Sequence, residues 1–362
     1  MFRFAIPALL LTQVAAHGSI LIPVSRNSID ATLPPWSHGK HPPTGKNVYS
    51  GNACICVNGT NDCNSGQSCF WFSQGCTIGC KRCDGNGTRL PNWDHCPGES
   101  INATLNDRKY RTANRNATAG SPEDVWKHQP WRAPGKAPVF DPCGMAGGRW
   151  AQVPHGGNNG GDGATFNATK FAKQGDLGSQ VLAPRPTGTV WTRGTAELTA
   201  WYITFNHGGG YRYRLCPAHE ELTEECFAAN QLDFVGTTHT IRYGNNTARV
   251  IANNIVKEGG GIGWMMNPIP NPIGYTSTCE HSDGSPCDGC PCGSGYPGGA
   301  SSKNFPNPLP GPYGDHADQK FRIEDRVHVP SELKPGEYVL GWRWDCETSS
   351  QVWQACADIT IV

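Results

Sequence analysis

Glycine and proline interrupt this chain throughout. The 362 residues include 45 Gly and 29 Pro, and both residue types are disfavoured in the interior of a helix. A bundle of long helices is therefore excluded, and the chain must fold through short elements joined by many turns. A hydrophobic fraction of 37% with 12 Trp provides enough apolar side chains for a packed core, so wholesale disorder is excluded as well.

Strand patterns dominate wherever the sequence is periodic. Residues 197–205, 249–256, 338–344 and 357–362 are rich in aromatic and β-branched residues and are separated by Gly, Pro and Asn. In residues 338–344 the large apolar side chains alternate, which places them on one face of a strand. The pattern predicts an all-β, immunoglobulin- or fibronectin-like sandwich. A short helix is expected around 222–230, and residues 259–311 are expected to form a long Cys-, Gly- and Pro-rich loop.

Charge and hydropathy exclude two classes of partner. The chain carries 30 Lys and Arg against 30 Asp and Glu, a formal net charge of zero. No basic excess supports nucleic-acid binding. No apolar run of about 18 residues follows the N-terminus, so no membrane-spanning helix is expected.

The first 16 residues have the form of a secretory signal peptide. Arg3 precedes an apolar run, and small residues end the segment at Ala16. Cleavage there would leave one domain, residues 17–362, that begins with His17. We expect a secreted, extracellular protein, with attachment to the cell surface as the alternative.

Cysteines and glycosylation sequons agree with secretion. Eight of the 17 cysteines lie between residues 54 and 96, and an oxidising compartment would pair them, which predicts a disulfide-stapled insertion at about 52–98. Because the number of cysteines is odd, no disulfide partner is assigned to one of them. Six N-x-[ST] sequons predict exposed glycosylation sites, namely Asn58, Asn86, Asn102, Asn116, Asn167 and Asn245.

Two histidines form a candidate copper site. A mature N-terminal His17 would offer its α-amine, with an ordinary pKa of about 7.7–8.0, together with a ring nitrogen. His207 follows the predicted strand 197–205 and precedes three glycines, so its ring could supply a third nitrogen. Three nitrogens in a tetragonal arrangement favour Cu(II). Taken alone, His207 would be an ordinary turn histidine.

Four segments carry a family resemblance. Residues 17–28 resemble an N-terminal H-G…P-x-R-N-S pattern, with one residue's difference in spacing. Residues 206–217 resemble N-H-x-G-x-[FY]…L-C-P, residues 223–227 resemble T-x-E-C-F, and residues 353–359 resemble [FY]-R-A-C-A-D-I. Together they resemble the copper-dependent lytic polysaccharide monooxygenases, or chitin-binding type-4 domains, and most of all auxiliary-activity family fifteen.

The resemblance implies both a fold and an activity. It implies a β-sandwich with copper on a flat face, held by His17 and His207, and oxidative cleavage of an insoluble polysaccharide at C1 or C4. Chitin is the favoured substrate and cellulose the next. An external electron donor and oxygen or peroxide would be partners, and we expect a monomer. A non-catalytic carbohydrate-binding protein and a copper-holding protein with a histidine brace stay as alternatives.

Three positions near the expected copper need separate interpretation. Trp353 stands where the family has Tyr or Phe, and it either shields the axial side, acts as a redox-active aromatic, or is ordinary core. Phe205 replaces a usual Ala and could crowd the other axial site. Gln351 is either a hydrogen-bond donor that orients an oxygen species or an exposed strand-edge residue.

Disulfides and surface aromatics complete the predictions. Cys216 with Cys226, and Cys346 with Cys356, flank short intervals, and we expect each pair to be a disulfide that fixes a loop beside the copper. Cys143 is expected to pair with an early cysteine. Four aromatic residues could stack on sugar rings or pack inside small loops, namely Trp36, Trp71, Phe72 and Trp264.

Overall fold

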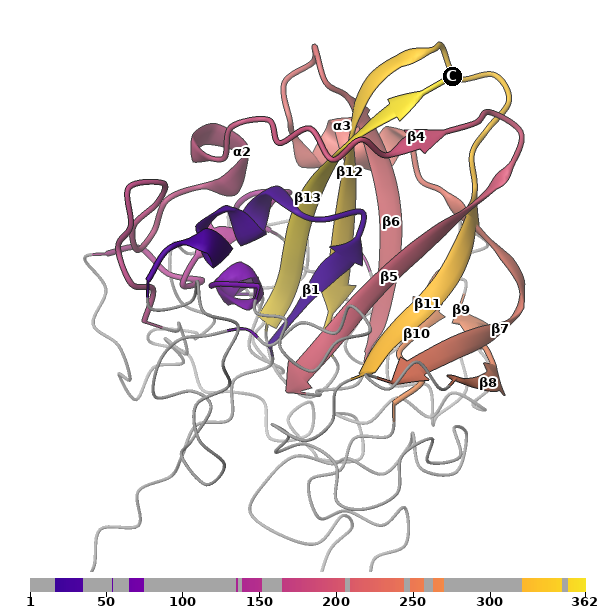
Figure 1. Ribbon diagram of the computed structural model, residues 1–362, viewed down its shortest axis with the longest axis horizontal. Coiled ribbons are helices and arrows are strands. Elements are labelled where there is room, and N and C mark those ends of the chain that lie inside the picture. Colours follow the sequence, from indigo (N-terminus) through magenta and orange to yellow (C-terminus); the bar gives the residue numbers. More distant parts are fainter. Residues whose placement is uncertain are drawn as a thin grey trace, which may run out of the picture.

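The computed structural model describes residues 17–34, 54, 65–74, 135, 139–151, 165–205, 209–243, 248–256, 263–269, 321–346 and 351–362. Within these residues the chain forms two β-sheets that pack face to face (Figure 1). The all-β sandwich predicted from the sequence is therefore confirmed.

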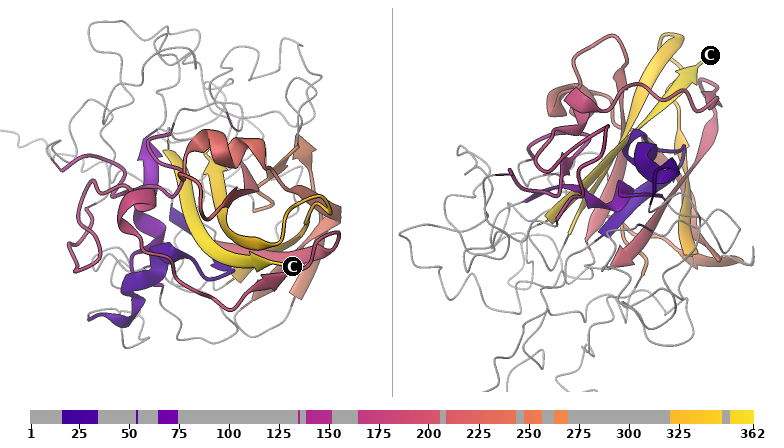
Figure 2. Two further views of the ribbon diagram at one scale, coloured as in Figure 1. Left: turned by 90° about the horizontal axis from the view of Figure 1, so that it is seen from above. Right: turned by 60° about the vertical axis from the view of Figure 1, so that its left-hand side comes forward.

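One sheet has five strands in the described part of the chain. Their spatial order is β1-β5-β11-β7-β8, and all the pairs are antiparallel. The strands are β1 (His17–Ile22), β5 (Ala196–Phe205), β11 (Phe321–His328), β7 (Asp233–Tyr243) and β8 (Ala248–Ala252). Figure 2 shows this layer and the second sheet from two further sides.

The second sheet follows the order β3-β2-β13-β12-β6-β10-β9 within the described residues, and β4 adds a parallel pair with β13. Its strands are β2 (Trp71–Gln74), β3 (Met145–Ala146), β4 (Val190–Trp191), β6 (Gly210–Pro217), β9 (Ile255–Val256), β10 (Trp264–Met266), β12 (Gly336–Asp345) and β13 (Gln351–Ile361). Strand β12 is central, with β13 on one side and β6 on the other.

The core lies between the two sheets and is dominated by aromatic rings. Trp201 from the first sheet packs against Trp342 and Trp344 of β12, with ring centroids 5.2 Å apart in both pairs. All three side chains are fully buried. The alternation predicted for residues 338–344 is confirmed, because Tyr338, Leu340, Trp342 and Trp344 all belong to this core.

The helices formed by the described residues are short. They are η1 (Arg26–Thr32), η3 (Ser68–Phe70), α2 (Gly178–Val181) and α3 (Glu224–Ala229). Helix α3 begins where the sequence predicts one, because the Thr223 side chain accepts a hydrogen bond from the Cys226 amide and caps the first turn. None of the helices that the structure describes is long and apolar enough to cross a membrane.

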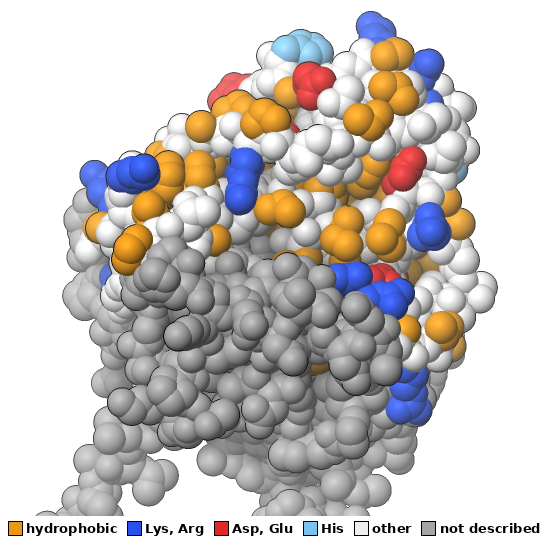
Figure 3. All heavy atoms as spheres, in the orientation of Figure 1, with side chains coloured by type: hydrophobic (Ala, Val, Ile, Leu, Met, Phe, Trp, Pro, Cys, Tyr) orange, Lys and Arg blue, Asp and Glu red, His pale blue; other side chains and the backbone are white. Residues whose placement is uncertain are grey.

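Two predicted segments differ from the structure. The strand expected at 249–256 is divided into β8 and β9, which belong to different sheets. The loop expected at 259–311 contains β10, which pairs with β6. On the face shown in Figure 3, acidic and basic side chains of the described residues are interspersed among apolar and polar ones, in agreement with the balanced charge.

Candidate functional site

The ends of several strands meet at one end of the sandwich. His17, the first residue of β1, pairs with Phe205, the last residue of β5. Figure 1 shows the start of β1, the end of β5, the end of β12 and the start of β13 at the same lower end. The backbone of His17 therefore lies beside the strand end that leads, two residues later, to His207.

The second sheet adds two more strand ends at this place. Asp345, the last residue of β12, pairs with Gly210, the first residue of β6. The Cys346 amide then donates to the Gln351 carbonyl oxygen at 3.1 Å, where β13 begins. His207 thus belongs to the short connection between β5 and β6, and Gln351 opens the strand on the other side of β12.

Gly18 fixes the start of β1 against the core. A Cβ atom at this position would lie 2.9 Å from the Tyr202 carbonyl oxygen and 3.2 Å from the Trp344 ring. Real Cβ atoms avoid contacts this short with backbone, so only glycine allows β1 to lie so close. In the His-Gly pair at 17–18, the packing of β1 therefore explains why the second residue is glycine.

Gln351 and Trp353 are both buried in β13. Gln351 is 1% exposed, so the alternative of an exposed strand-edge glutamine is wrong. Trp353 is fully buried and stacks on Phe72, with ring centroids 4.2 Å apart and an interplanar angle of 27°. This packing agrees with the interpretation of Trp353 as core, while a role beside copper stays a prediction.

Several predicted site residues lie outside the description. They include His207 and the side chains of His17 and Phe205. Of the six sequons, the structure describes Asn167, which is exposed. The other five lie outside the described residues: Asn58, Asn86, Asn102, Asn116 and Asn245.

The disulfides match one predicted pair and correct another. Cys216 and Cys226 are joined, as their spacing predicts. Cys356 pairs with Cys143 instead of Cys346, across 213 residues of sequence, so the expected Cys346–Cys356 pair and the expected early partner of Cys143 are both wrong. The reason is direction: Cys356 faces the outside of its sheet with Cys143, whereas the buried Cys346 belongs to the inner core. In the predicted insertion, Cys54 pairs with Cys69.

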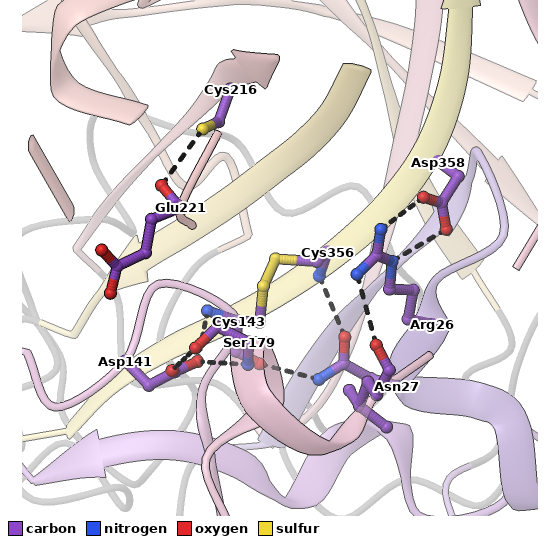
Figure 4. The surroundings of a disulfide bond; sticks show 10 residues. Arg26, Asn27, Asp141, Cys143, Ser179, Cys216, Glu221, Cys356 and Asp358 are labelled. Atoms are coloured by element: carbon purple, nitrogen blue, oxygen red, sulfur yellow. Dashed lines mark hydrogen bonds and ion pairs between the residues drawn. A yellow bond between two sulfur atoms is a disulfide. The ribbon is translucent and has the colours of Figure 1, made fainter. Parts of the chain in front are cut away.

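The motif residues after β1 hold this disulfide in place (Figure 4). The Asn27 side chain donates to the Cys143 carbonyl oxygen at 2.8 Å and accepts from the Cys356 amide at 2.9 Å. The Arg26 guanidinium binds both carboxylate oxygens of Asp358, at 2.8 and 2.5 Å. Two of the segments that carry the resemblance, at opposite ends of the chain, therefore bind one another directly.

An ionic cluster lies on the outer face of the second sheet, with its arginines and Asp345 buried and Glu224 half-buried. Arg343 binds Asp345 through two hydrogen bonds, at 2.7 and 3.0 Å, and Glu224 at 2.6 Å, while Arg214 also binds Glu224. Burial raises the pKa of Glu224, but Arg214 and Arg343 outweigh it and lower this pKa to about 2. Glu224 is therefore held between two guanidinium groups and is not a solvated surface charge.

The signal for this cluster in the sequence is a pair of arginines at alternate positions of β6. Arg212 and Arg214 alternate with tyrosines, a pattern that would ordinarily place the arginines in water. Here Arg214 binds Glu224 of α3, Arg212 donates to the carbonyl oxygens of Leu232 and Gly263, and both arginines are buried. The sequence alone gives no indication of these partners.

The aromatic residues expected on a sugar-binding surface are buried where the structure describes them. Trp71 is 1% exposed, Phe72 is fully buried, and Trp264 is 9% exposed and lies under the Arg343 guanidinium. They pack inside the protein, which was the alternative interpretation. Trp36 lies outside the described residues.

The described residues bring one set of potential metal ligands together. Cys216, Glu220 and Cys226 have their ligand atoms within 4.8 Å of one another. The two cysteines are joined in a disulfide, so neither offers a thiolate, and metal binding needs the thiolate form. This group is therefore a structural disulfide with a carboxylate beside it.

Comparison with known proteins gives structural likenesses only. No protein-family model matches the chain, and no curated protein matches it. Among solved structures, an AA15 lytic polysaccharide monooxygenase from Thermobia domestica in the Cu(I) state is 13% identical, over 62% of this chain and 76% of that one, with a TM-score of 0.25.

Two further structures give similar values. An AA10 lytic polysaccharide monooxygenase from Streptomyces lividans is 12% identical over 51% of this chain, with a TM-score of 0.21, and the chain spans 63% of its length, less than two thirds. A chitin-binding domain from Burkholderia pseudomallei is 10% identical over 96% of this chain and 100% of that one, with a TM-score of 0.26. At these values the likenesses carry no argument about activity.

Proposed function

We propose that this chain is a secreted, copper-dependent enzyme that oxidatively cleaves glycosidic bonds in an insoluble polysaccharide. The observation that carries the proposal is the pairing of His17 with Phe205. It brings the expected mature N-terminus next to the strand end that precedes His207. The motifs at 17–28, 206–217, 223–227 and 353–359 support the same function by resemblance.

The donor chemistry of the proposed site fits copper. After cleavage behind Ala16, His17 would offer an α-amine and an imidazole, and His207 a second imidazole. These are nitrogen donors without a carboxylate, a set that suits copper and not calcium or magnesium. Copper would supply the redox chemistry, with electrons from an external donor and oxygen or peroxide as co-substrate.

The surrounding side chains would orient and shield the reaction. Gln351, at the start of β13, would donate a hydrogen bond from its amide and orient the oxidant. Trp353, packed on Phe72, would exclude water from the side that faces the core. Phe205, opposite His17 in register, would crowd the other side of the metal.

The substrate class follows from the resemblance. Chitin is the favoured polysaccharide, with cellulose next, and the protein would act as an extracellular monomer. Two alternatives remain: a carbohydrate-binding protein without catalysis, and a copper-holding protein. The burial of Trp71, Phe72 and Trp264 removes three of the four aromatic residues that could have stacked on sugar rings, in the enzyme and in the carbohydrate-binding protein alike.

Electron paramagnetic resonance of the processed protein with one equivalent of Cu(II) tests the proposal. We expect a tetragonal spectrum with three nitrogen ligands, lost in His207→Ala and in a variant with one extra residue before His17. The exposed His219 provides the matched control, and His219→Ala should keep the spectrum. Oxidised oligosaccharides released from chitin or cellulose with reductant and peroxide would then separate the enzyme from the copper-holding alternative.

The result that overturns the proposal is equally definite. If the processed protein binds Cu(II) no more tightly than His207→Ala does, both copper functions fall. A protein that shows the spectrum but releases no oxidised product from any insoluble glycan would be a copper-holding protein.

A further inference from the structure

Asp345 occupies an unusual place at the end of a central strand. It is the last residue of β12, and it pairs with Gly210 of β6 on one side and Val352 of β13 on the other. Gly210 lies three residues after His207, and Val352 directly follows Gln351. Strand β6, which begins three residues after the proposed ligand His207, and strand β13, which begins with the proposed orienting residue Gln351, therefore both start beside Asp345.

The carboxylate of Asp345 is buried and bound from two directions. Only 3% of the residue is exposed. One oxygen accepts from the Arg343 Nε at 2.7 Å; the other accepts from the Arg343 Nη2 at 3.0 Å and from the Gly135 amide at 2.7 Å. Gly135, with φ of 86°, lies against the Trp264 ring, where a Cβ atom would come within 2.8 Å. Asp345 thus ties a distant segment to the strand end.

The same carboxylate is the last member of a charge-balanced cluster. Arg343 also binds Glu224 of α3, which in turn binds Arg214 of β6, so two guanidinium groups face two carboxylates among the described residues. Buried charges of this kind hold fixed positions, because moving one leaves another without its partner. The cluster therefore fixes β6, β12 and α3 relative to one another beside the strand ends.

We propose that Asp345 is a positioning residue for the copper end of the sandwich. Through Arg343 and Gly135 it holds the end of β12, and with it the start of β6, three residues after His207 in sequence, and the start of β13, which is Gln351. Asp345 would not be a metal ligand itself, because its side chain lies on the outer face of the sheet with Arg343, whereas Trp344 and Trp353 lie on the inner face. This inference rests on the proposed function.

A matched pair of double variants separates positioning from simple stability. Arg343→Met/Asp345→Leu removes both charges of the pair and leaves no uncompensated charge, a replacement that buried ion pairs often tolerate. Arg26→Met/Asp358→Leu does the same to another two-bonded pair, between η1 and β13, whose carboxylate lies near the opposite end of β13. Asp345→Asn serves as a second variant if the first double variant does not fold.

Cu(II) affinity, the Cu(II) spectrum and hydrogen exchange of the Cys346 amide are measured in all variants. That amide donates to the Gln351 carbonyl oxygen and so reports on the strand ends without metal. We expect about a tenfold loss of affinity, an altered spectrum and faster exchange in the Asp345 variants, with the Arg26/Asp358 variant like wild type. Losses of that size are typical when groups that orient metal ligands are removed.

Each result decides one of the two proposals. If the Asp345 variants bind copper with wild-type affinity and spectrum, or if the Arg26/Asp358 variant changes equally, Asp345 has no positioning role. If wild type binds no copper, the proposed function falls, while exchange at Cys346 still shows whether Asp345 holds the strand ends.

Discussion

The clearest pH effect should come from Asp141. Burial raises the pKa of this carboxyl from 3.8 to about 6, although hydrogen bonds from Ser179 and the Cys143 amide lower it in part. Asp141 is 3% exposed and lies beside the Cys143–Cys356 disulfide, where Figure 4 shows it bound to Ser179. The folded protein therefore holds a proton here that the unfolded chain has already released at pH 5.

The sign of the effect follows from proton binding. Because the folded state binds more protons than the unfolded state between pH 3.8 and 6, its stability must fall as pH rises through this range. A pKa difference of one unit between the folded and the unfolded state is worth about 1.4 kcal/mol, so the total loss in unfolding free energy is on the order of 3 kcal/mol. It should be present below pH 4 and lost above pH 6.

Urea unfolding with the disulfides intact, measured from pH 4 to pH 7, checks this prediction. In Asp141→Asn the loss of about 3 kcal/mol over that range should disappear. Asp176→Asn, a half-buried carboxyl that accepts from the Lys173 amide, should keep it. A wild-type protein whose stability does not fall, or an Asp141→Asn variant with an unchanged pH profile, would refute the reasoning.

Three further substitutions test the fold around the site. Cys143→Ser removes a disulfide that spans 213 residues, which the chain-entropy estimate values at about 5 kcal/mol; a much smaller change in urea unfolding would contradict that estimate. Gly148→Ala should cost about 1–3 kcal/mol in the same assay, because φ is 66° and a Cβ atom would lie 2.0 Å from the Phe72 ring. In free energy, Gly18→Ala should cost more in Cu(II) binding than in unfolding, as judged from the melting temperature, because its Cβ atom would push β1 away from Trp344. A variant with the copper affinity of wild type would show that the start of β1 is not constrained.

The sequence predicts the strands whose side chains alternate between apolar and polar. β5 and β12 begin and end within one or two residues of the predicted ranges, because aromatic and β-branched residues fill their inner faces. β6 was not predicted, since its outer face carries Arg212 and Arg214. Those arginines are buried only because Glu224 and the backbone of other segments bind them, and no local pattern encodes such partners.

The candidate site, too, could be predicted from the sequence only in part. The sequence supplies the two histidines, and in the structure His17, at the start of β1, pairs with Phe205, which precedes His207 by two residues. Spacing predicts the Cys216–Cys226 disulfide but not the partner of Cys356: Cys346 is ten residues from Cys356, but Cys143, far away in sequence, faces the same side of the sheet as Cys356. Alternation within β13 decides the partner, and it is known only once the register is known.

The position of the proposed N-terminal ligand depends on the other sheet. Among the described residues β1 is an edge strand that pairs with β5 alone, and an edge strand by itself leaves its first residue poorly fixed. Gly18 changes this, because it sits directly on the ring of Trp344, which belongs to the central strand β12. The ring in turn packs on Trp201 of β5, at 5.2 Å between centroids. Asp345 follows Trp344 and is bound on the outer face of β12. The first residue of β1 is therefore positioned by a strand that is held on both faces, and a metal site requires such rigid support.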